Sequence, residues 1–228
     1  AVGYSAGGTI STGTQNTFVG GLAGDSTDDG GNNAALGYAA LSANCGNENT
    51  AFGAYAGTAI TGASNTIVGY TAGFELAGGD NCLFLGKDSG RTGSPGGQIV
   101  NGDNEIVLGD DNISEAHIQV DWTVASDQRD KTDFTALDLG LDFVKALAPV
   151  TYKWDKRSKY GDKTAEGYDL NAQTPDGTHK EDWLDIGFKA QEVEALEIAA
   201  GYNKSSKTNL ISSHTGDGKQ MGLQYSKF

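Results

Sequence analysis

Runs of three residues, mostly apolar and each followed by a glycine, recur through the first half of the chain. They are Thr17-Phe18-Val19, Ala34-Ala35-Leu36, Thr50-Ala51-Phe52, Thr66-Ile67-Val68, Leu83-Phe84-Leu85 and Ile106-Val107-Leu108. Side chains alternate between the two faces of a strand, so neighbouring apolar residues indicate strands that are buried on both faces. One face can fill the inside of a coil. Because large apolar residues are few elsewhere in each unit, we expect the other face to pack against another copy of the chain.

The six glycines that follow these runs, together with Gly3, mark an internal repeat of mostly 16 or 17 residues. They are Gly3, Gly20, Gly37, Gly53, Gly69, Gly86 and Gly109. An asparagine stands four or five residues before six of them: Asn16, Asn33, Asn49, Asn65, Asn81 and Asn104. Glycine and asparagine suit the corners of a coil, where the backbone needs a positive φ or a hydrogen bond from a side chain. The pattern predicts a mainly β repeat region, a parallel β-roll or solenoid.

The pattern changes beyond the repeats. Residues 116–122 alternate between apolar and polar types, which predicts a strand that leads out of the repeat region. Residues 137–147 predict a helix, and Pro149 follows its end. The apolar residues at helical spacing are Leu137, Leu141, Val144 and Leu147.

The remaining residues predict a small α+β domain. Residues 149–154 have the composition of a strand, and residues 155–182 form a long polar excursion or hairpin. Residues 190–200 place Ala190, Val193 and Leu196 on one face of a short helix.

Composition supports a boundary at residue 126. The first 125 residues hold 25 of the 34 glycines and 13 acidic but only 2 basic residues, whereas the rest hold 17 acidic and 14 basic residues. Such a shift is typical of a domain boundary. We therefore predict two domains, a repeat β-roll over residues 1–125 and a second domain over residues 126–228.

The bulk numbers also restrict the partners. A net charge of −14 argues against nucleic acid or an anionic membrane as a partner. No apolar run approaches the 18 residues that a membrane-spanning helix needs, so we expect no membrane insertion. An apolar content of 37% is low for a chain that buries a large core alone, which again favours burial against partner chains.

The repeats resemble those of two kinds of fibrous protein. They are similar to the parallel β-roll of trimeric autotransporter adhesin heads. The resemblance is closer to the Asn-Thr-Ala-Phe-Gly-type repeats that precede auto-processing domains in phage tail fibres, as in Asn49-Thr50-Ala51-Phe52-Gly53. Both resemblances imply a parallel homotrimer.

Four later motifs resemble one family, in the same order. They are Ser126-Asp127-Gln128-Arg129-Asp130-Lys131, Leu147-Ala148-Pro149-Val150-Thr151-Tyr152-Lys153-Trp154, Ile186-Gly187-Phe188-Lys189-Ala190-Gln191-Glu192-Val193 and Tyr225-Ser226-Lys227. The family is the intramolecular chaperone domain of phage tail spikes, endosialidases and L-shaped tail fibres, an auto-releasing peptidase. Asp130 stands where the family commonly has an apolar residue. The family usually continues into long C-terminal helices that trimerise, and we expect the chain to lack them after Phe228.

By this resemblance Ser126 is the nucleophile and Lys131 the general base of a single-turnover, self-cleaving serine endopeptidase. A serine hydroxyl attacks only when a base takes its proton, and a lysine amine acts as that base only when it is neutral. A free lysine has a pKa of about 10.4, so burial or nearby positive charge must lower the pKa of such a base. No His–Asp pair stands nearby in the sequence to form a triad with the serine, which favours a Ser–Lys dyad.

The bond that is cut has two candidates. The family implies Ser126-Asp127. The Ala125-Ser126 bond is chemically plausible too, because a serine can attack the preceding carbonyl by an N→O shift. Attack by Ser126 on its own carbonyl would need a strained four-membered ring, so a cut after Ser126 would point to a serine from a neighbouring subunit.

The other chemistry-bearing residues predict no further site. The loop acids Asp25, Asp28, Asp29, Asp80, Asp110 and Asp111 keep no constant register, whereas calcium-binding repeats need Asp at a fixed place in every unit. We therefore expect solvated loops, with neither a metal nor a cofactor. Cys45 and Cys82 predict two free, buried thiols. Trp122, Trp154 and Trp183 predict core or domain-contact residues rather than a sugar-binding surface.

These features favour the tip of a phage tail fibre, a trimeric, host-contacting β-roll with a disposable folding domain. Such a protein would be assembled in the host cytoplasm and then belong to the virion. Its partners would be other tail proteins and a host receptor, either glycan or protein. A bacterial trimeric adhesin and a purely structural shaft are the alternatives. A polysaccharide hydrolase would need paired carboxylates in a cleft, which the irregular loop acids do not indicate.

Overall fold

The structure, a computed structural model, describes residues 1–119, 122–134, 139–163, 165–203 and 210–227. Contacts divide the chain into two compact units. The first contains Ala1–Asn112, Asp155–Glu181 and His214–Met221. The second contains Ile113–Trp154, Asp182–Ser213 and Gly222–Phe228. Two segments from beyond residue 126 therefore pack with the repeats.

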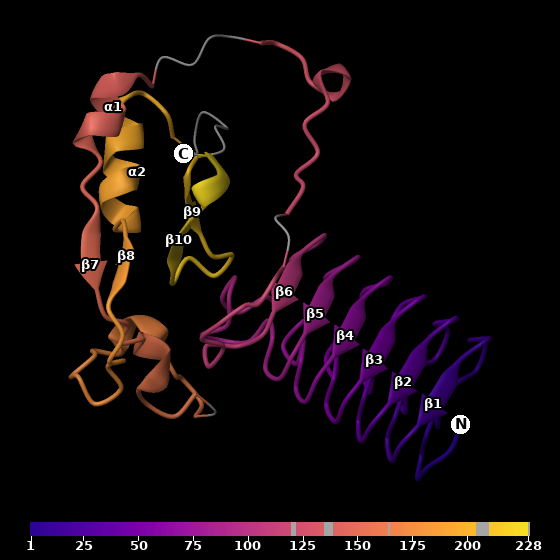
Figure 1. Ribbon diagram of the computed structural model, residues 1–228. Coiled ribbons are helices and arrows are strands. Elements are labelled where there is room, and N and C mark those ends of the chain that lie inside the picture. The colour runs from indigo at the N-terminus through magenta and orange to yellow at the C-terminus, as the bar shows by residue number, and fades with distance from the viewer. Residues whose placement is uncertain (120–121, 135–138, 164, 204–209, 228) are drawn as a thin grey trace. The chain divides into compact units, whose positions relative to one another are not determined.

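The repeats of the first unit form a parallel β-solenoid (Figure 1). Each coil contributes one three-residue strand, and the strands stack in chain order into a single six-stranded sheet. The strands are β1 (Thr17–Val19), β2 (Ala34–Leu36), β3 (Thr50–Phe52), β4 (Thr66–Val68), β5 (Leu83–Leu85) and β6 (Ile106–Leu108). Their register places equivalent residues side by side, as in Phe18 with Ala35 and Ala51 with Ile67. The predicted mainly β solenoid is confirmed.

The middle residue of every strand lies inside the coil. These residues are Phe18, Ala35, Ala51, Ile67, Phe84 and Val107, each at most 3% exposed. The prediction that one strand face fills the coil is therefore confirmed.

The residue after each of these lies on the opposite face, which we call the outer ladder. Its members are Val19, Leu36, Phe52, Val68, Leu85 and Leu108, which are 37–48% exposed in the single chain. The second face of the strands is thus apolar and uncovered within one chain.

A ladder of buried asparagines holds neighbouring coils together. The Asn49 backbone N–H donates to Asn33 Oδ1 at 2.8 Å, and the Asn65 N–H donates to Asn49 Oδ1 at 3.0 Å. The Asn49 side-chain amide donates to the Gly62 carbonyl at 2.9 Å. Coil corners thus use the side-chain hydrogen bonds that the sequence predicted.

The last two asparagines of the sequence pattern are not part of this ladder. Asn81 and Asn104 are exposed, with φ of 55° and 60°, at the positive-φ corner just before the ladder position. Cys82 takes the next rung instead, because its backbone N–H donates to Asn65 Oδ1 at 2.9 Å. The asparagines of these two units stand five rather than four residues before their glycines, and they meet the positive-φ requirement of a coil corner.

The corner glycine cannot be replaced by a larger residue. Gly53 has φ of 136°, and a Cβ there would clash with the Gly69 carbonyl oxygen of the next coil. Gly37 and Gly69 have the same conformation and the same close approach. The repeat therefore requires glycine for both its φ and the contact between coils.

Two short segments complete the first unit. The polar excursion predicted for residues 155–182 contains the 3₁₀ turns η2 (Arg157–Lys159) and η3 (Leu170–Ala172), and Leu170 is fully buried. The second segment, His214–Met221, contains the turn between strands β9 (Ser212–His214) and β10 (Met221–Leu223), which pair in a two-stranded sheet.

The second unit has the α+β composition that the sequence predicts. It contains η1 (Gln128–Asp130), α1 (Leu141–Ala146), β7 (Val150–Tyr152), β8 (Asp185–Gly187), α2 (Ala190–Ala199) and η5 (Tyr225–Lys227). Strands β7 and β8 pair antiparallel, with Val150 opposite Gly187. The strand expected at 149–154 and the helix expected at 190–200 are confirmed.

Two expected elements differ from the structure. Residues 116–119 and 122 form no strand, because alternation alone provides no partner for their backbone hydrogen bonds; Val120 and Asp121 lie outside the described residues. The helix expected from Leu137 begins at Leu141, after Gly140, and Leu137 lies outside the described residues. None of the helices in the described ranges is long and apolar enough to cross a membrane.

Candidate functional site

The junction of the two predicted domains folds into a tight turn around Asp127. Asp127 caps η1, because its Oδ1 accepts a hydrogen bond from the Arg129 backbone N–H at 2.9 Å. The Arg129 guanidinium forms an ion pair with the same carboxylate, with Nη2 2.5 Å from Oδ2. The Lys131 N–H then donates to the Gln128 carbonyl at 3.2 Å and ends the turn.

This turn brings Lys131 back to Ser126. The Lys131 Nζ donates a hydrogen bond to Ser126 Oγ at 2.6 Å and lies 3.4 Å from the Ser126 carbonyl oxygen. A base within hydrogen-bond reach of the hydroxyl is the first geometric requirement for general-base catalysis. Both residues are exposed in the single chain. The arrangement can transfer a proton only if the amine becomes neutral.

The charges around the turn leave the lysine amine available. Hydrogen bonds from the Arg129 side chain and backbone lower the pKa of Asp127, so this carboxylate is ionised and already paired. Among the described residues, no carboxylate forms an ion pair with Lys131.

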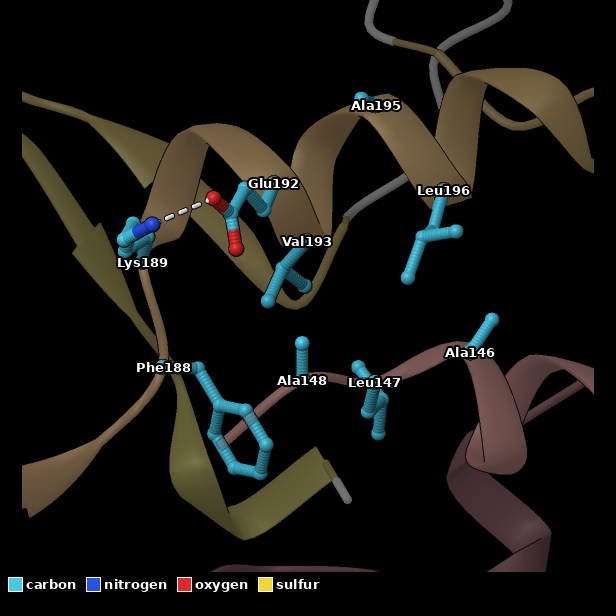
Figure 2. Close-up of a pocket in the computed structure, with 9 residues that line it drawn as sticks. All are labelled: Ala146, Leu147, Ala148, Phe188, Lys189, Glu192, Val193, Ala195 and Leu196. Carbon is cyan, nitrogen blue, oxygen red and sulfur yellow. Dashed lines mark hydrogen bonds and ion pairs between the residues drawn. The ribbon is translucent and has the colours of Figure 1, made fainter. Parts of the chain in front are cut away.

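An apolar pocket of about 260 Å³ lies between α2 and the residues that follow α1 (Figure 2). Val193 and Leu196 point from α2 toward Leu147 and Ala148, and the Lys189–Glu192 ion pair, 2.7 Å long, lies at one side. None of the lining residues is a predicted site residue or a nucleophile. The lining is apolar apart from this Lys189–Glu192 pair.

Glu197 is a buried carboxylate that the sequence analysis did not identify. It is 2% exposed, and it accepts hydrogen bonds from the Ile211 N–H at 2.5 Å and from Ser212 Oγ at 2.6 Å. These bonds attach Ile211 and Ser212, at the start of β9, to the last turns of α2. Nothing in the local sequence marks Glu197, because its partners lie 14 and 15 residues away.

The tryptophans are not core residues. Trp122, Trp154 and Trp183 are 74%, 45% and 82% exposed. Their exposure in the single chain contradicts a place in the core, whereas the alternative of domain-contact residues stays a prediction. Trp154 still contacts Tyr152 edge to face, with ring centroids 5.3 Å apart.

The thiols follow the prediction. Cys45 and Cys82 are free and buried, as expected. Burial raises the pKa of both thiols above the ordinary value of 9.0, so neither is a reactive thiolate near pH 7. Within the described ranges, no three His, Cys, Asp or Glu side chains gather where they could hold a metal ion.

Comparison with known proteins gives one match. Residues 126–202, about a third of the chain, match the peptidase family described as chaperone of endosialidase. The match begins at Ser126 and includes Lys131, the β7–β8 pair and α2. No curated protein and no solved structure matches the chain.

Proposed function

We propose that the chain is a distal, host-contacting phage tail fibre protein. In this proposal its C-terminal domain drives trimerisation and then releases itself by autoproteolysis at Ser126. Two findings support it: residues 126–202 match the family described as chaperone of endosialidase, and they follow a β-solenoid. The observation that carries the proposal is the 2.6 Å contact between Lys131 Nζ and Ser126 Oγ at the first residues of the family match.

In the proposed reaction Ser126 Oγ is the nucleophile and Lys131 Nζ the general base. The neutral amine takes the hydroxyl proton as Oγ bonds to the scissile carbonyl carbon. The resulting ammonium then returns the proton to the leaving amine as the peptide bond breaks. Water hydrolyses the ester that remains. Each chain is cut once, because its own junction is the substrate.

The two candidate bonds imply different donors of the hydroxyl. For Ala125-Ser126, the chain's own Oγ can attack through a five-membered ring. For Ser126-Asp127, the same attack needs a four-membered ring, so a neighbouring subunit would supply the hydroxyl. The Lys131 Nζ, 3.4 Å from the Ser126 carbonyl oxygen, is placed to polarise that carbonyl in the second case.

Trimerisation would complete the site. Lys131 is exposed in the single chain, and a solvated lysine holds its proton at neutral pH. Burial between three chains would disfavour the ammonium and release the amine as a base. Cleavage would then report correct assembly.

The outer ladder supports the proposed homotrimer. Its side chains form a continuous apolar row along the solenoid, including Leu36 at 48% and Phe52 at 44% exposure. Covering this row removes apolar surface from water in every coil. The similarity of the coils lets chains slip by one unit, so a separate domain is needed to set their register.

In this proposal the protein is assembled in the host cytoplasm and becomes part of the virion. It contacts other tail proteins and a host cell-surface receptor, either glycan or protein, and needs no cofactor or nucleic acid. A bacterial trimeric adhesin or a structural shaft with the same self-cleaving domain is the alternative. A binding assay of the cleaved repeat trimer with glycans and host cells separates a host-contacting fibre tip from a structural shaft. The tip should bind, and the shaft should not.

The self-cleavage part is tested by a substitution series on the whole chain. Ser126→Ala and Lys131→Ala should each give uncut trimers on a denaturing gel, and Lys131→Arg should fail as well because a guanidinium does not give up its proton. Lys145→Ala, in α1, is the matched control and should cut normally. Efficient cleavage of the Ser126 or Lys131 variants in pure protein would remove that residue from the mechanism.

A further inference from the structure

The last coil of the solenoid contacts two segments that lie beyond the proposed cut. We call the coil's contact residues the terminal surface; they are Gln98, Asp111 and Asn112. The cap loops are residues 156–163 and 215–219. All of them belong to the first compact unit, although up to 119 residues of sequence separate the partners.

Asp111 is the centre of the terminal surface. Asp111 is 7% exposed, and its Oδ2 accepts a hydrogen bond from Lys163 Nζ at 2.5 Å. Its backbone carbonyl accepts from Lys156 Nζ at 3.1 Å. Lys159 adds a hydrogen bond to Asn112 Oδ1. Three lysines of one cap loop therefore converge on two consecutive residues of the coil.

Asp217 provides a second anchor, from the turn between β9 and β10. Its Oδ2 accepts a hydrogen bond from the Gln98 backbone N–H at 3.2 Å. Its Oδ1 accepts from Thr215 Oγ1 at 2.5 Å and from the Lys219 N–H at 3.0 Å, which fixes the shape of the turn. Gly97 makes room for this carboxylate, since a Cβ there would lie 2.7 Å from Asp217 Oδ1.

The cap loops also support each other. Arg157 Nη2 donates to the Lys219 carbonyl at 2.5 Å, which joins the first loop to the second. Ser158, 3% exposed, lies so close to Gly93 that a Cβ on the glycine would be 2.7 Å from the Ser158 Cβ. The loops thus pack against the coil as one body.

Charge matches across this contact. Residues 156–163 contain four basic residues and one acidic residue, whereas residues 1–125 contain 13 acidic and 2 basic residues. The contacts of Lys156, Lys163 and Asp217 with the coil are hydrogen bonds or ion pairs, and the Lys163 side chain is still 32% exposed. Partly exposed ion pairs weaken as ionic strength rises.

We propose that the terminal surface is a docking site for the cap loops of this same chain, which keep the C-terminal piece bound to the solenoid after the chain is cut between them. Cutting the peptide bond then does not itself separate the two pieces. Separation depends on ionic strength, through the lysine contacts to Asp111 and Asn112. The proposal rests on the proposed function only for how the two pieces arise.

The test therefore uses an external protease on the full chain. Ser126→Ala removes self-cleavage, and a recognition sequence for a specific protease is inserted between Ser114 and Glu115, both exposed. After digestion, size-exclusion chromatography compares the pieces at about 0.05 M and about 1 M NaCl, where the Debye length falls to ~3 Å. We expect the pieces to elute together at low salt and apart at high salt. Failure of self-cleavage in the natural chain would not affect this measurement.

Substitutions identify the contact. Lys163→Ala should weaken the association of the pieces at least about tenfold, the effect expected for a charge-assisted hydrogen bond. Lys180→Ala, an exposed lysine of the same segment, is the matched control and should not change it. Asp217→Asn should act in the same direction as Lys163→Ala, and circular dichroism verifies that each variant is folded. Pieces that separate at low salt, or that stay together equally at high salt and in both variants, would overturn the proposal.

Discussion

At the scale of single residues, the asparagine ladder accounts for the cohesion of the coils. Asn49 is fully buried, and it uses both its side-chain oxygen and its side-chain amide between coils. A buried donor or acceptor that loses its partner costs about 1–3 kcal/mol. Each rung therefore binds the following coil twice, once through its side-chain oxygen and once through its side-chain amide.

Replacing one rung should destabilise the solenoid. Asn49→Ala removes the acceptor for the Asn65 N–H and the donor to the Gly62 carbonyl, so we expect a loss of about 3 kcal/mol in the free energy of unfolding. Chemical denaturation monitored by circular dichroism measures it. Asn44→Ala is the control, because Asn44 is exposed and accepts one bond from the Asp28 N–H. Equal losses in the two variants would show that the ladder has no special role.

Asp217 should make stability depend on pH. Burial tends to raise its pKa, but the hydrogen bonds from Thr215, Lys219 and Gln98 outweigh burial and hold the pKa below its ordinary value of 3.8. A carboxyl whose pKa is lowered on folding stabilises the fold above the unfolded pKa, and this contribution is lost as the pH falls through the folded pKa.

The corresponding measurement compares the natural chain with Asp217→Asn. We expect a lower thermal midpoint for the variant at pH 7, and a difference that narrows as the pH is lowered below about 3.8. A difference that stayed constant from pH 7 to pH 3 would show that the charge of Asp217 does not contribute.

At the scale of the elements, each strand is only three residues long, so the corners rather than the strands determine the solenoid. Five corner glycines have φ between 136° and 141°, and a Cβ on any of them would clash with the backbone of the next coil: Gly3, Gly20, Gly37, Gly53 and Gly69. A Cβ would therefore introduce both backbone strain and a backbone clash.

Gly53→Ala should cost about 3 kcal/mol or more, seen as a lower unfolding midpoint and less soluble protein. Gly216→Ala is the control, because a Cβ on Gly216 meets nothing within 4 Å and its φ is not in the left-handed region. Normal stability of Gly53→Ala would mean that coils can move apart at this corner.

The sequence predicts these elements well where the repeat provides redundant information. Six units each show the same apolar run and glycine, and the structure has a strand at every one. Single observations are less reliable. The alternation over 116–122 predicts a strand, but the described residues 116–119 and 122 form none, and Cys82 rather than Asn81 takes the rung after Asn65.

Long-range contacts are outside the reach of sequence patterns. Lys163 and Asp111 are 52 residues apart, and Gln98 and Asp217 are 119 residues apart. No periodicity in the sequence links such pairs. The sequence shows that residues 156–163 are rich in basic residues, but not which acidic residue they contact. The closeness of Ser126 and Lys131 was expected only through family resemblance, because Ser and Lys at this spacing are common in solvated loops.

At the scale of the whole molecule, the two faces of each strand have different roles. Ile67 is fully buried inside the coil, whereas Phe52, in the preceding strand, belongs to the uncovered outer ladder. A charge at the first position opposes folding of the chain itself. A charge at the second opposes only the packing of one chain on another.

In the proposed trimer, Phe52→Asp should therefore shift the chains toward monomer while coils still form, and Ile67→Asp should prevent coil formation. Light scattering reports the mass and circular dichroism the β content. A monomeric natural chain at micromolar concentration, or a trimeric Phe52→Asp variant, would contradict a trimer built on the outer ladder.

In the proposed mechanism, assembly of the trimer switches on the cut at Ser126. The direct measurement is to refold the full chain from denaturant, separate monomer and trimer at intervals by size exclusion, and weigh the chains in each fraction by mass spectrometry. We expect cut chains only in the trimer fraction, and a cleavage rate that rises steeply with protein concentration. The masses of the pieces should identify the cut bond as Ala125-Ser126 or Ser126-Asp127. Cleavage of isolated monomers at the same rate, or trimers of Ser126→Ala with the same cut, would contradict it.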